Sequence, residues 1–185
     1  MGRVSQAQAR ENRQRIVDTA SRLFREQGTH VSVADLMKAA GLTHGGFYKQ
    51  FASKEALIDE ATTHAFGELA ERRTVERGLR AGQGAARQAF IDAYLSVEHR
   101  DNAADGCPVA GLAVDMARGS GDREAHRVYA EGVSDFAEWL GADDGDGISR
   151  LCTMIGALVL ARATKGSPLS EEILASARAA LTVGE

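Results

Sequence analysis

Apolar residues in the first third of the chain recur with a helical period and are separated by helix start and stop signals. The first stripe comprises Ile16, Ala20, Leu23 and Phe24. Positions four, seven and eight residues apart lie on one face of an α-helix. With Gly28 as a stop signal, the stripe predicts a helix over residues 10–27.

A second, shorter helix is expected directly after Ser32. The segment Ser-Val-Ala-Asp that begins there has the form of a capping box, in which the serine hydroxyl accepts a free N–H group of the first turn. Leu36, Met37 and Ala40 would form the buried face of this helix. Gly41 then predicts a sharp turn.

Two further helix starts follow closely. Thr43 is expected to cap a third helix, whose inner side carries Phe47 and Phe51 four residues apart. Ser53 is expected to cap a fourth helix that extends into the rest of the chain. Short helices joined by a glycine-containing turn on a compact core predict a helix-turn-helix unit.

The remainder of the chain predicts more helices and no strands. Strand-like alternation is almost absent, and only two prolines interrupt 185 residues. We therefore expect an all-α fold of about nine helices, with a helix-turn-helix domain over residues 1–55 and a regulatory and dimerisation domain over residues 56–185. The breaks are expected at residues 78–84, 101–106, 119–121, 141–147 and 166–168.

The charge distribution gives the two predicted domains different partners. Residues 1–55 carry a net charge of +4 and residues 56–185 a net charge of −8, so the overall value of −4 conceals a basic N-terminal third. A basic end on an acidic body suggests that only this end meets a polyanion. Chance clustering of the charges is the alternative.

Composition also limits the compartment and the chemistry. No N-terminal segment has the pattern of a signal peptide, and no apolar run approaches the roughly 20 residues needed to cross a membrane. Two cysteines at unrelated spacing form neither a disulfide framework nor a zinc site. We expect a cytoplasmic protein without metal or cofactor.

Two adjacent glycines, Gly45 and Gly46, stand where the third helix should begin. Each glycine in a helix costs about 1 kcal/mol relative to alanine. Since the second helix of a helix-turn-helix enters the major groove by its N-terminal end, glycine there would let the backbone approach DNA closely. A tight turn without a ligand is the alternative, but the surrounding hydroxyl and basic residues favour the DNA interpretation.

The stretch from Gly41 to Leu57, GLTHGGFYKQFASKEAL, resembles the DNA-binding domain of TetR-family transcriptional regulators, as does the sequence from about Arg10 onward. The resemblance covers about a quarter of the chain. It implies that Tyr48 and Lys54 bind phosphate, that Lys49 contacts bases, and more speculatively that Arg10 and Arg13 add contacts. The implied DNA-binding residues are Ser32, Thr43, His44, Gly45, Tyr48, Lys49 and Lys54.

The same resemblance implies a homodimer that binds double-stranded DNA at a palindromic operator. Residues 148–162 are apolar on both sides, which is typical of a helix buried all round, either by its own core and a partner or wholly inside a monomer. With the last helix, this segment is expected to form a four-helix interface. The expected interface residues are Leu151, Ile155, Leu158, Val159, Ile173, Leu174, Ala177 and Leu181.

A small-molecule effector of unknown identity is also implied for the second domain. Apolar and amphipathic residues on the middle helices are candidates to line its cavity, although any of them could be ordinary core. The candidates are Phe66, Phe90, Tyr94, Cys107, Met116, Tyr129 and Phe136.

Cys107 carries a more specific hypothesis. Because Pro108 suits the first helical position, Cys107 should lie at a helix N-terminus, where the dipole can lower the pKa of a thiol and make it reactive. The Gly-Cys-Pro segment is similar to a subset of TetR-family proteins that sense oxidants or electrophiles. A buried structural cysteine is the alternative, and Cys152 is expected to be packing.

Enzymatic motifs were not found. The chain has no nucleophile elbow, no P-loop and no dinucleotide-binding fingerprint. His99-Arg100-Asp101 has the residues of a kinase catalytic loop, but the glycine-rich loop and the length of a kinase are absent. We therefore expect a sequence-specific regulator, acting as a repressor released by a small molecule or a thiol-reactive signal. A small-molecule-binding helical protein without a functional operator is the alternative.

Overall fold

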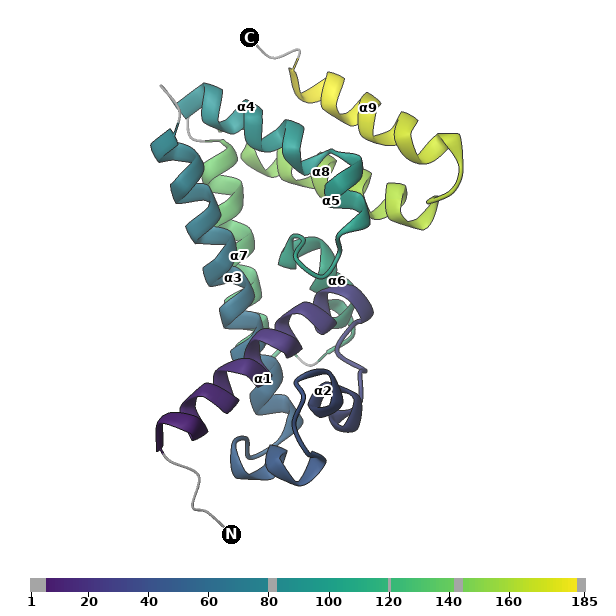
Figure 1. Cartoon of the computed structure of the whole chain (residues 1–185). Helices are drawn as coiled ribbons and strands as arrows, with labels where there is room; N and C mark the ends of the chain where they lie inside the picture. The colour runs from purple at the N-terminus through teal and green to yellow at the C-terminus, as the bar shows by residue number, and fades with distance from the viewer. Residues whose placement is uncertain (1–5, 80–82, 120, 142–144, 183–185) are drawn as a thin grey trace.

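The computed structural model describes residues 6–79, 83–119, 121–141 and 145–182 (Figure 1). Over these residues the secondary structure consists of helices alone, so the predicted all-α fold is confirmed. The elements in chain order are α1 (Gln6–Gln27), α2 (Val33–Ala39), the 3-10 helix η1 (His44–Lys49), α3 (Lys54–Leu79), α4 (Gln83–Tyr94), α5 (Val97–Asp101), α6 (Pro108–Arg118), α7 (Glu124–Leu140), α8 (Gly147–Ala163) and α9 (Pro168–Thr182).

Two of the three predicted helix caps form their expected hydrogen bonds. The Asp35 N–H donates to Ser32 Oγ at 3.1 Å, and the Ala56 N–H donates to Ser53 Oγ at 3.2 Å. Thr43 occupies the cap position before η1, but its side chain makes no cap bond. This third element is a 3-10 helix, a geometry common in short segments; six residues that include two glycines gain little from a regular α-helix.

One break between helices was missed. The sequence predicted no interruption between residues 84 and 101, whereas α4 ends at Tyr94 and Ser96 caps the separate helix α5 by accepting the His99 N–H at 3.2 Å. The other predicted breaks coincide with the gaps between helices. Residues 80–82, 120 and 142–144 of those breaks lie outside the described residues.

Two hydrophobic cores share the long helix α3. The N-terminal core contains Leu57 and Ala61 of α3 together with the apolar faces of α1, α2 and η1. The second core contains Phe66 and Leu69, farther along the same helix. Because α3 passes without interruption from one core to the other, a domain boundary at residue 55 falls at the beginning of a continuous helix.

Helix α6 also contributes to both cores. Val109 and Ala110 in its first turn belong to the second core, whereas Leu112 and Met116 pack into the N-terminal core. The N-terminal domain is therefore not closed by its own residues alone, and α6 lies between the two parts of the molecule (Figure 1).

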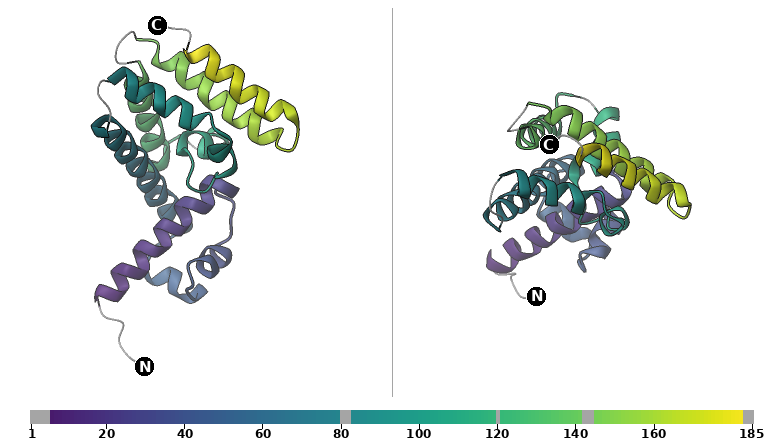
Figure 2. Two further views of the ribbon diagram at one scale, coloured as in Figure 1. Left: turned by 45° about the horizontal axis from the view of Figure 1, so that its top comes forward. Right: turned by 90° about the horizontal axis from the view of Figure 1, so that it is seen from above.

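The helices are arranged so that the two ends of the molecule differ. Helices α1, α2 and η1 gather at one end, the antiparallel pair α8 and α9 lies at the other, and α3 and α7 pack side by side between them (Figure 1). Seen from above, α8 and α9 project beyond the rest of the bundle (Figure 2). No helix within the described ranges is long and apolar enough to cross a membrane.

Candidate nucleic-acid interface and internal cavity

The residues around η1 form an exposed polar face. Thr43, His44 and Lys49 are exposed, and Tyr48 exposes 65% of its surface. The Tyr48 ring packs edge-on against Phe47, with 5.2 Å between ring centroids, and Phe47 is completely buried. A rigid core residue therefore positions an aromatic ring whose hydroxyl faces solvent.

The basic residues of this face are available to a polyanion to different degrees. Lys49 makes no ion pair within the described part of the chain, and Lys54 is partly buried at the beginning of α3. Ser32 is exposed, but its hydroxyl donates to Asp35 Oδ2 at 2.6 Å. A phosphate contact by Ser32 would require that hydroxyl hydrogen to leave Asp35.

Gly45 has no structural need for glycine inside this chain. Neither Gly45 nor Gly46 has a positive φ, the conformation that would favour glycine, whereas Gly41 in the preceding turn has a φ of 69°. A Cβ added at Gly45 would meet no atom within 4 Å. The tight-turn alternative therefore does not account for Gly45, and open space next to the backbone remains for a partner.

Arg13, which was expected to add a DNA contact, makes contacts within the domain. Its guanidinium pairs with the Glu60 carboxylate and lies 4.4 Å from the centroid of the Phe51 ring. These contacts tie Arg13 of α1 to Glu60 of α3 and to Phe51, so its guanidinium is engaged within the domain. Arg10, one turn earlier, is exposed.

A cavity of about 570 Å³ lies between α3, α4 and the segment that leads into α6. Three of the predicted effector residues line it, namely Phe90, Tyr94 and Cys107. Its other lining residues are Glu68, Leu69, Glu71, Arg72, Ala93 and His99. The volume lies within the usual range for sites that bind small molecules.

The other four predicted effector residues lie outside this lining. Phe66 packs against Tyr129, whose hydroxyl donates to the Val109 carbonyl at 2.8 Å. Phe136 is completely buried, and Met116 belongs to the N-terminal core. Their apolar character is used in packing between helices, which a single sequence does not distinguish from cavity lining.

His99 and Cys107 are joined at the floor of the cavity. His99 Nδ1 lies 2.7 Å from the Tyr94 carbonyl, and His99 Nε2 accepts the Cys107 N–H at 3.2 Å. A ring nitrogen that accepts a hydrogen bond carries no proton, so this geometry assigns a neutral imidazole protonated at Nδ1. Burial, the largest cause, lowers the pKa of His99, as do Arg162 and Arg72, which agrees with the neutral form.

Cys107 precedes α6 as predicted, but its thiol is not activated. The residue is buried, and burial raises the pKa of its thiol above the usual value, although Tyr94 and the N–H groups of Ala110 and Val109 oppose the shift. The prediction that the helix N-terminus would lower this pKa is therefore wrong, because desolvation is the larger effect. Cys152, expected to be packing, is exposed on α8.

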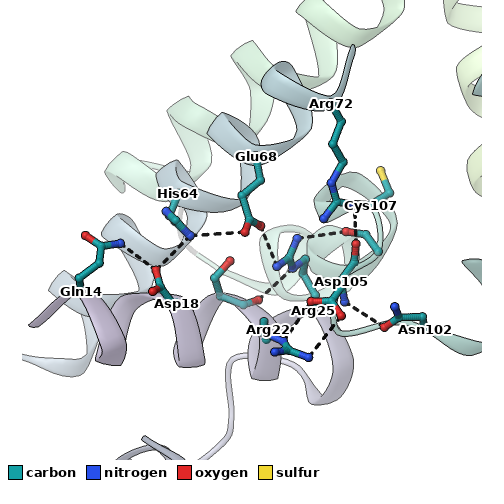
Figure 3. A network of polar contacts seen from close by, with 12 residues as sticks. Gln14, Asp18, Arg22, Arg25, His64, Glu68, Arg72, Asn102, Asp105 and Cys107 are labelled. Atoms are coloured by element: carbon teal, nitrogen blue, oxygen red, sulfur yellow. Dashed lines mark hydrogen bonds and ion pairs between the residues drawn. The ribbon is translucent and has the colours of Figure 1, made fainter. Parts of the chain in front are cut away.

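A buried arginine connects the cavity to the first helix (Figure 3). Arg25, at the end of α1, is 4% exposed; its guanidinium lies 2.9 Å from Glu68 Oε2 and donates to the Gly106 carbonyl at 3.2 Å. Glu68 lines the cavity, and Gly106 immediately precedes Cys107. No local sequence signal predicted these contacts, since the residues are far apart in the chain.

Helix α6 touches α1 and the turn after it at two more places. A Cβ added at Gly111 would lie 2.9 Å from the Arg25 carbonyl oxygen, so the two helices meet backbone to backbone here without room for alanine. Near the other end of α6, Asp115 accepts hydrogen bonds from the Thr29 N–H at 3.2 Å and the Thr29 hydroxyl at 2.8 Å. Helix α6 thus begins directly after Cys107, which lines the cavity, and contacts the N-terminal domain near its other end.

The predicted dimer residues divide between the interior and the surface. Leu151, Leu158, Leu174 and Ala177 are buried in the chain's own core and do not face outward. Ile155, Ile173 and Leu181 are partly buried, and Val159 is 42% exposed. Half of the predicted interface residues thus face the chain's own core. The large apolar residues that are exposed on α8 and α9 are Ile148, Val159, Leu160 and Leu169.

Comparison with known proteins supports the assignment of the N-terminal domain. Residues 16–61 match the family model described as bacterial regulatory proteins, tetR family. Over 61 residues the chain is 43% identical to the HTH-type transcriptional regulator AcrR of Shigella flexneri. That match covers 32% of this chain and 28% of AcrR, so it extends over less than a third of either protein.

Over most of its length the chain is similar in fold to solved structures. A TetR-family regulator from Cytophaga hutchinsonii is 19% identical, with a TM-score of 0.75 over 98% of this chain and 97% of its own. The reduced form of Escherichia coli NemR is also 19% identical, with a TM-score of 0.76 over 92% of this chain and 95% of its own. At such low identity the likeness shows a common fold. No group of three or more metal-ligating side chains occurs among the residues described.

Proposed function

Because the chain belongs to the TetR family of DNA-binding transcriptional regulators, we propose that it is a repressor that binds a palindromic operator as a homodimer and is released by a small molecule. The observation that carries the DNA-binding part is the exposed face around η1, where Gly45 is unexplained by internal packing. Close approach of the backbone to DNA accounts for that glycine.

The proposed docking assigns different roles to the residues of this face. Tyr48 and Lys54 bind phosphate, which fixes orientation without reading sequence. Thr43, His44 and Lys49 lie at η1 and contact base edges in the major groove. Ser32 is a weaker candidate than the others, because its hydroxyl is already bonded to Asp35.

The exposed apolar residues of α8 and α9 support a homodimer. Ile148 and Leu160 expose 72% and 56% of their surfaces on a helix whose opposite side is buried. A two-fold contact through this face would cover them and place two copies of η1 on one side of the dimer. Two recognition elements related by a two-fold axis suit an operator with the same symmetry.

The contacts of α6 support a route from the cavity to the DNA-binding end. A molecule that displaces Glu68 or Cys107 acts on Arg25, and movement of α6 acts on Thr29 through Asp115. The spacing of the two η1 elements would then no longer match successive major grooves. A 100-fold loss of operator affinity requires about 2.7 kcal/mol of coupling.

The state of Cys107 favours a non-covalent signal over a thiol-reactive one. The thiolate is the reactive form of cysteine, and burial keeps this thiol protonated by raising its pKa. Release by oxidation or alkylation of Cys107 is the second candidate, supported by its position in the cavity lining.

Selection of bound sites from random duplex DNA at physiological salt tests the proposal, repeated after treatment with maleimide. An enriched palindrome that survives the treatment is expected. A palindrome lost only when Cys107 is modified would support the thiol signal instead. No enriched sequence would support the alternative, a small-molecule-binding helical protein without a functional operator.

A further inference from the structure

Arg72 brings to the cavity a positive charge that no carboxylate among the described residues pairs with. It lines the cavity, and its guanidinium donates to the Asp105 carbonyl at 2.6 Å, which holds it against the segment before α6 (Figure 3). That carbonyl is neutral, and this is the one bond of Arg72 within the described ranges. Since a guanidinium has five N–H donors, most of them remain free for a further acceptor.

The carboxylates closest to Arg72 in this network are each paired with another arginine (Figure 3). Glu68 lies 2.9 Å from Arg25, and the Asp105 side chain lies 3.0 Å from Arg22. These two ion pairs are close to neutral as units, so neither carboxylate is left to compensate the charge of Arg72.

A second guanidinium adds positive charge next to the lining residue His99. Arg162 donates to the His99 and Arg100 carbonyls at 3.1 Å each, again without a carboxylate partner in the described part of the chain. Burial is the largest cause of the lowered pKa of His99, and the charges of Arg162 and Arg72 lower it further. Two guanidinium groups therefore act on the same end of the cavity.

Glu71 is the opposing charge among the lining residues. It is exposed and makes no hydrogen bond or ion pair within the described ranges. Because it directly precedes Arg72 in α3, its side chain leaves the helix about 100° away from that of Arg72. A free carboxylate at the surface can turn into solvent when an anion enters, whereas Arg72 is already held in place by Asp105. The fixed charge at the cavity is thus the positive one.

The wall opposite α3 offers apolar surface. Phe90 is partly exposed and Ala93 is exposed, and both line the cavity from α4. The Phe90 ring is supported edge-on by two other rings, with centroid distances of 5.5 Å to Phe136 and 4.9 Å to Trp139. A cavity of about 570 Å³ with this wall accommodates a flat ring system.

We propose that the cavity binds a carboxylate carried on an apolar ring system, with the carboxylate on the free N–H groups of Arg72 and the rings on Phe90. Guanidinium and carboxylate match each other as two forks, which gives parallel hydrogen bonds and a defined orientation. This inference rests on the proposed function in one respect only, namely that the bound acid is the signal that releases DNA.

Naphthoate and naphthamide of the same ring isomer are suitable probes, because they share one flat shape and differ in the charge of the head group. Binding to the full chain without DNA is measured by titration calorimetry at neutral pH, where the acid is ionised. We expect naphthoate to bind wild-type protein about three- to tenfold more tightly than naphthamide, since hydrogen bonds to a charged acceptor are the stronger ones. Added salt should reduce this preference.

The Arg72→Gln variant removes the charge and keeps a polar side chain, so it should bind the two probes alike. Arg127→Gln is the matched control, because Arg127 is an exposed arginine of α7 that pairs with Glu124 and Glu131 and does not line the cavity; it should retain the preference for naphthoate. Glu71→Gln removes the opposing charge and should tighten naphthoate binding about twofold.

Equal binding of the two probes to wild-type protein, tighter binding of naphthamide, or an unchanged preference in Arg72→Gln would overturn the inference, as would failure of both probes to bind. Circular dichroism establishes that each variant is folded, as expected for substitutions of exposed residues. Because these titrations contain no DNA, they succeed or fail independently of operator selection, so a failed ligand class and a failed regulator are distinguishable.

Discussion

Glu68 Oε2 lies 2.9 Å from a guanidinium nitrogen of Arg25, and this ion pair joins the rim of the internal cavity to the last turn of the first helix. The Arg25 side chain is 2% exposed and the Glu68 side chain 34%. An almost fully buried cation is thus held by a carboxylate that a ligand can reach. The pair is therefore both a stabilising contact and a point at which the cavity can influence the DNA-binding domain.

Replacing Glu68 by glutamine should destabilise the protein more than the same change at its neighbour. Glu68→Gln leaves the buried Arg25 charge without its counter-ion, and we expect the free energy of unfolding to fall by about 1–2 kcal/mol. Glu71→Gln is the control, since Glu71 is exposed; its effect should stay within about 0.5 kcal/mol. Urea denaturation of both variants compares them, and equal losses would contradict the assigned role of the ion pair.

The neutral His99 predicts a loss of stability in acid. Its pKa in the folded state lies below the usual 6.5, so its contribution is complete above pH 6.5 and is lost as the pH falls towards the lower folded value. Over that window the free energy of unfolding should fall with decreasing pH by at most about 1.4 kcal/mol per pH unit. Tyr94, Cys107, Arg162 and Arg72 are the groups around the ring that keep it neutral or contact it.

The measurement is the free energy of unfolding by urea between pH 5 and pH 8 for wild-type protein and His99→Gln. The variant lacks a titrating group at this position, so its stability should decline less between pH 6.5 and pH 5. Parallel curves for the two proteins would show that His99 is not the group responsible.

Phosphate contacts by Tyr48 and Lys54 predict a loss of affinity that does not depend on sequence. Tyr48→Phe and Lys54→Ala should weaken binding to the selected operator and to unrelated duplexes by similar factors, and Lys54→Ala should reduce the salt slope by about one. Lys165→Ala is the control, because Lys165 lies after α8 and pairs with Asp101 at 3.1 Å. Fluorescence anisotropy at several salt concentrations measures the DNA affinity of the three variants. If the dependence of log affinity on log salt concentration were unchanged in Lys54→Ala, its phosphate contact would be excluded.

A charge on the outward side of α8 should break the proposed dimer. Val159 is 42% exposed on that side, and Val159→Glu should weaken dimerisation on the order of 30-fold or more, as expected for a buried hot spot. Val114→Glu is the control, because Val114 is 56% exposed on a different helix, α6. Sedimentation velocity distinguishes monomer from dimer; a Val159→Glu protein that remains dimeric would place the interface elsewhere.

Local signals in the sequence were sufficient for most of the helices and their ends, although the break between α4 and α5 was missed. The stripe that includes Ile16 and Phe24 is buried in α1, and Ser32 and Ser53 form the caps that their positions predicted. Such features depend on residues within one or two turns of each other, which a single sequence displays directly. The exposed face around Tyr48 followed from the same reasoning together with a family resemblance.

Features that depend on packing between distant segments were not predictable. The ion pair of Arg25 and Glu68 joins residues 43 positions apart, and His99 lines the cavity although its sequence context suggested no role. On α8 both sides are apolar, so composition could not show that Leu158 faces inward and Val159 outward. The pKa of Cys107 depended on burial, which position at a helix end does not reveal.

The central claim, that the face around η1 binds operator DNA, is tested most directly by comparing Gly45→Ala with Gly67→Ala. Both glycines lie in helices, and a Cβ at either would meet no atom of the chain within 4 Å. Neither substitution should therefore destabilise the fold, and each should raise the free energy of unfolding by up to about 1 kcal/mol.

Operator affinity should separate the two variants. We expect Gly45→Ala to weaken operator binding by at least about tenfold, because its methyl group occupies the space that the DNA backbone requires, and Gly67→Ala to bind as wild type does. Anisotropy titration of one labelled operator with the three proteins is the decisive measurement. Equal affinities for all three would contradict the proposed docking of this face on DNA.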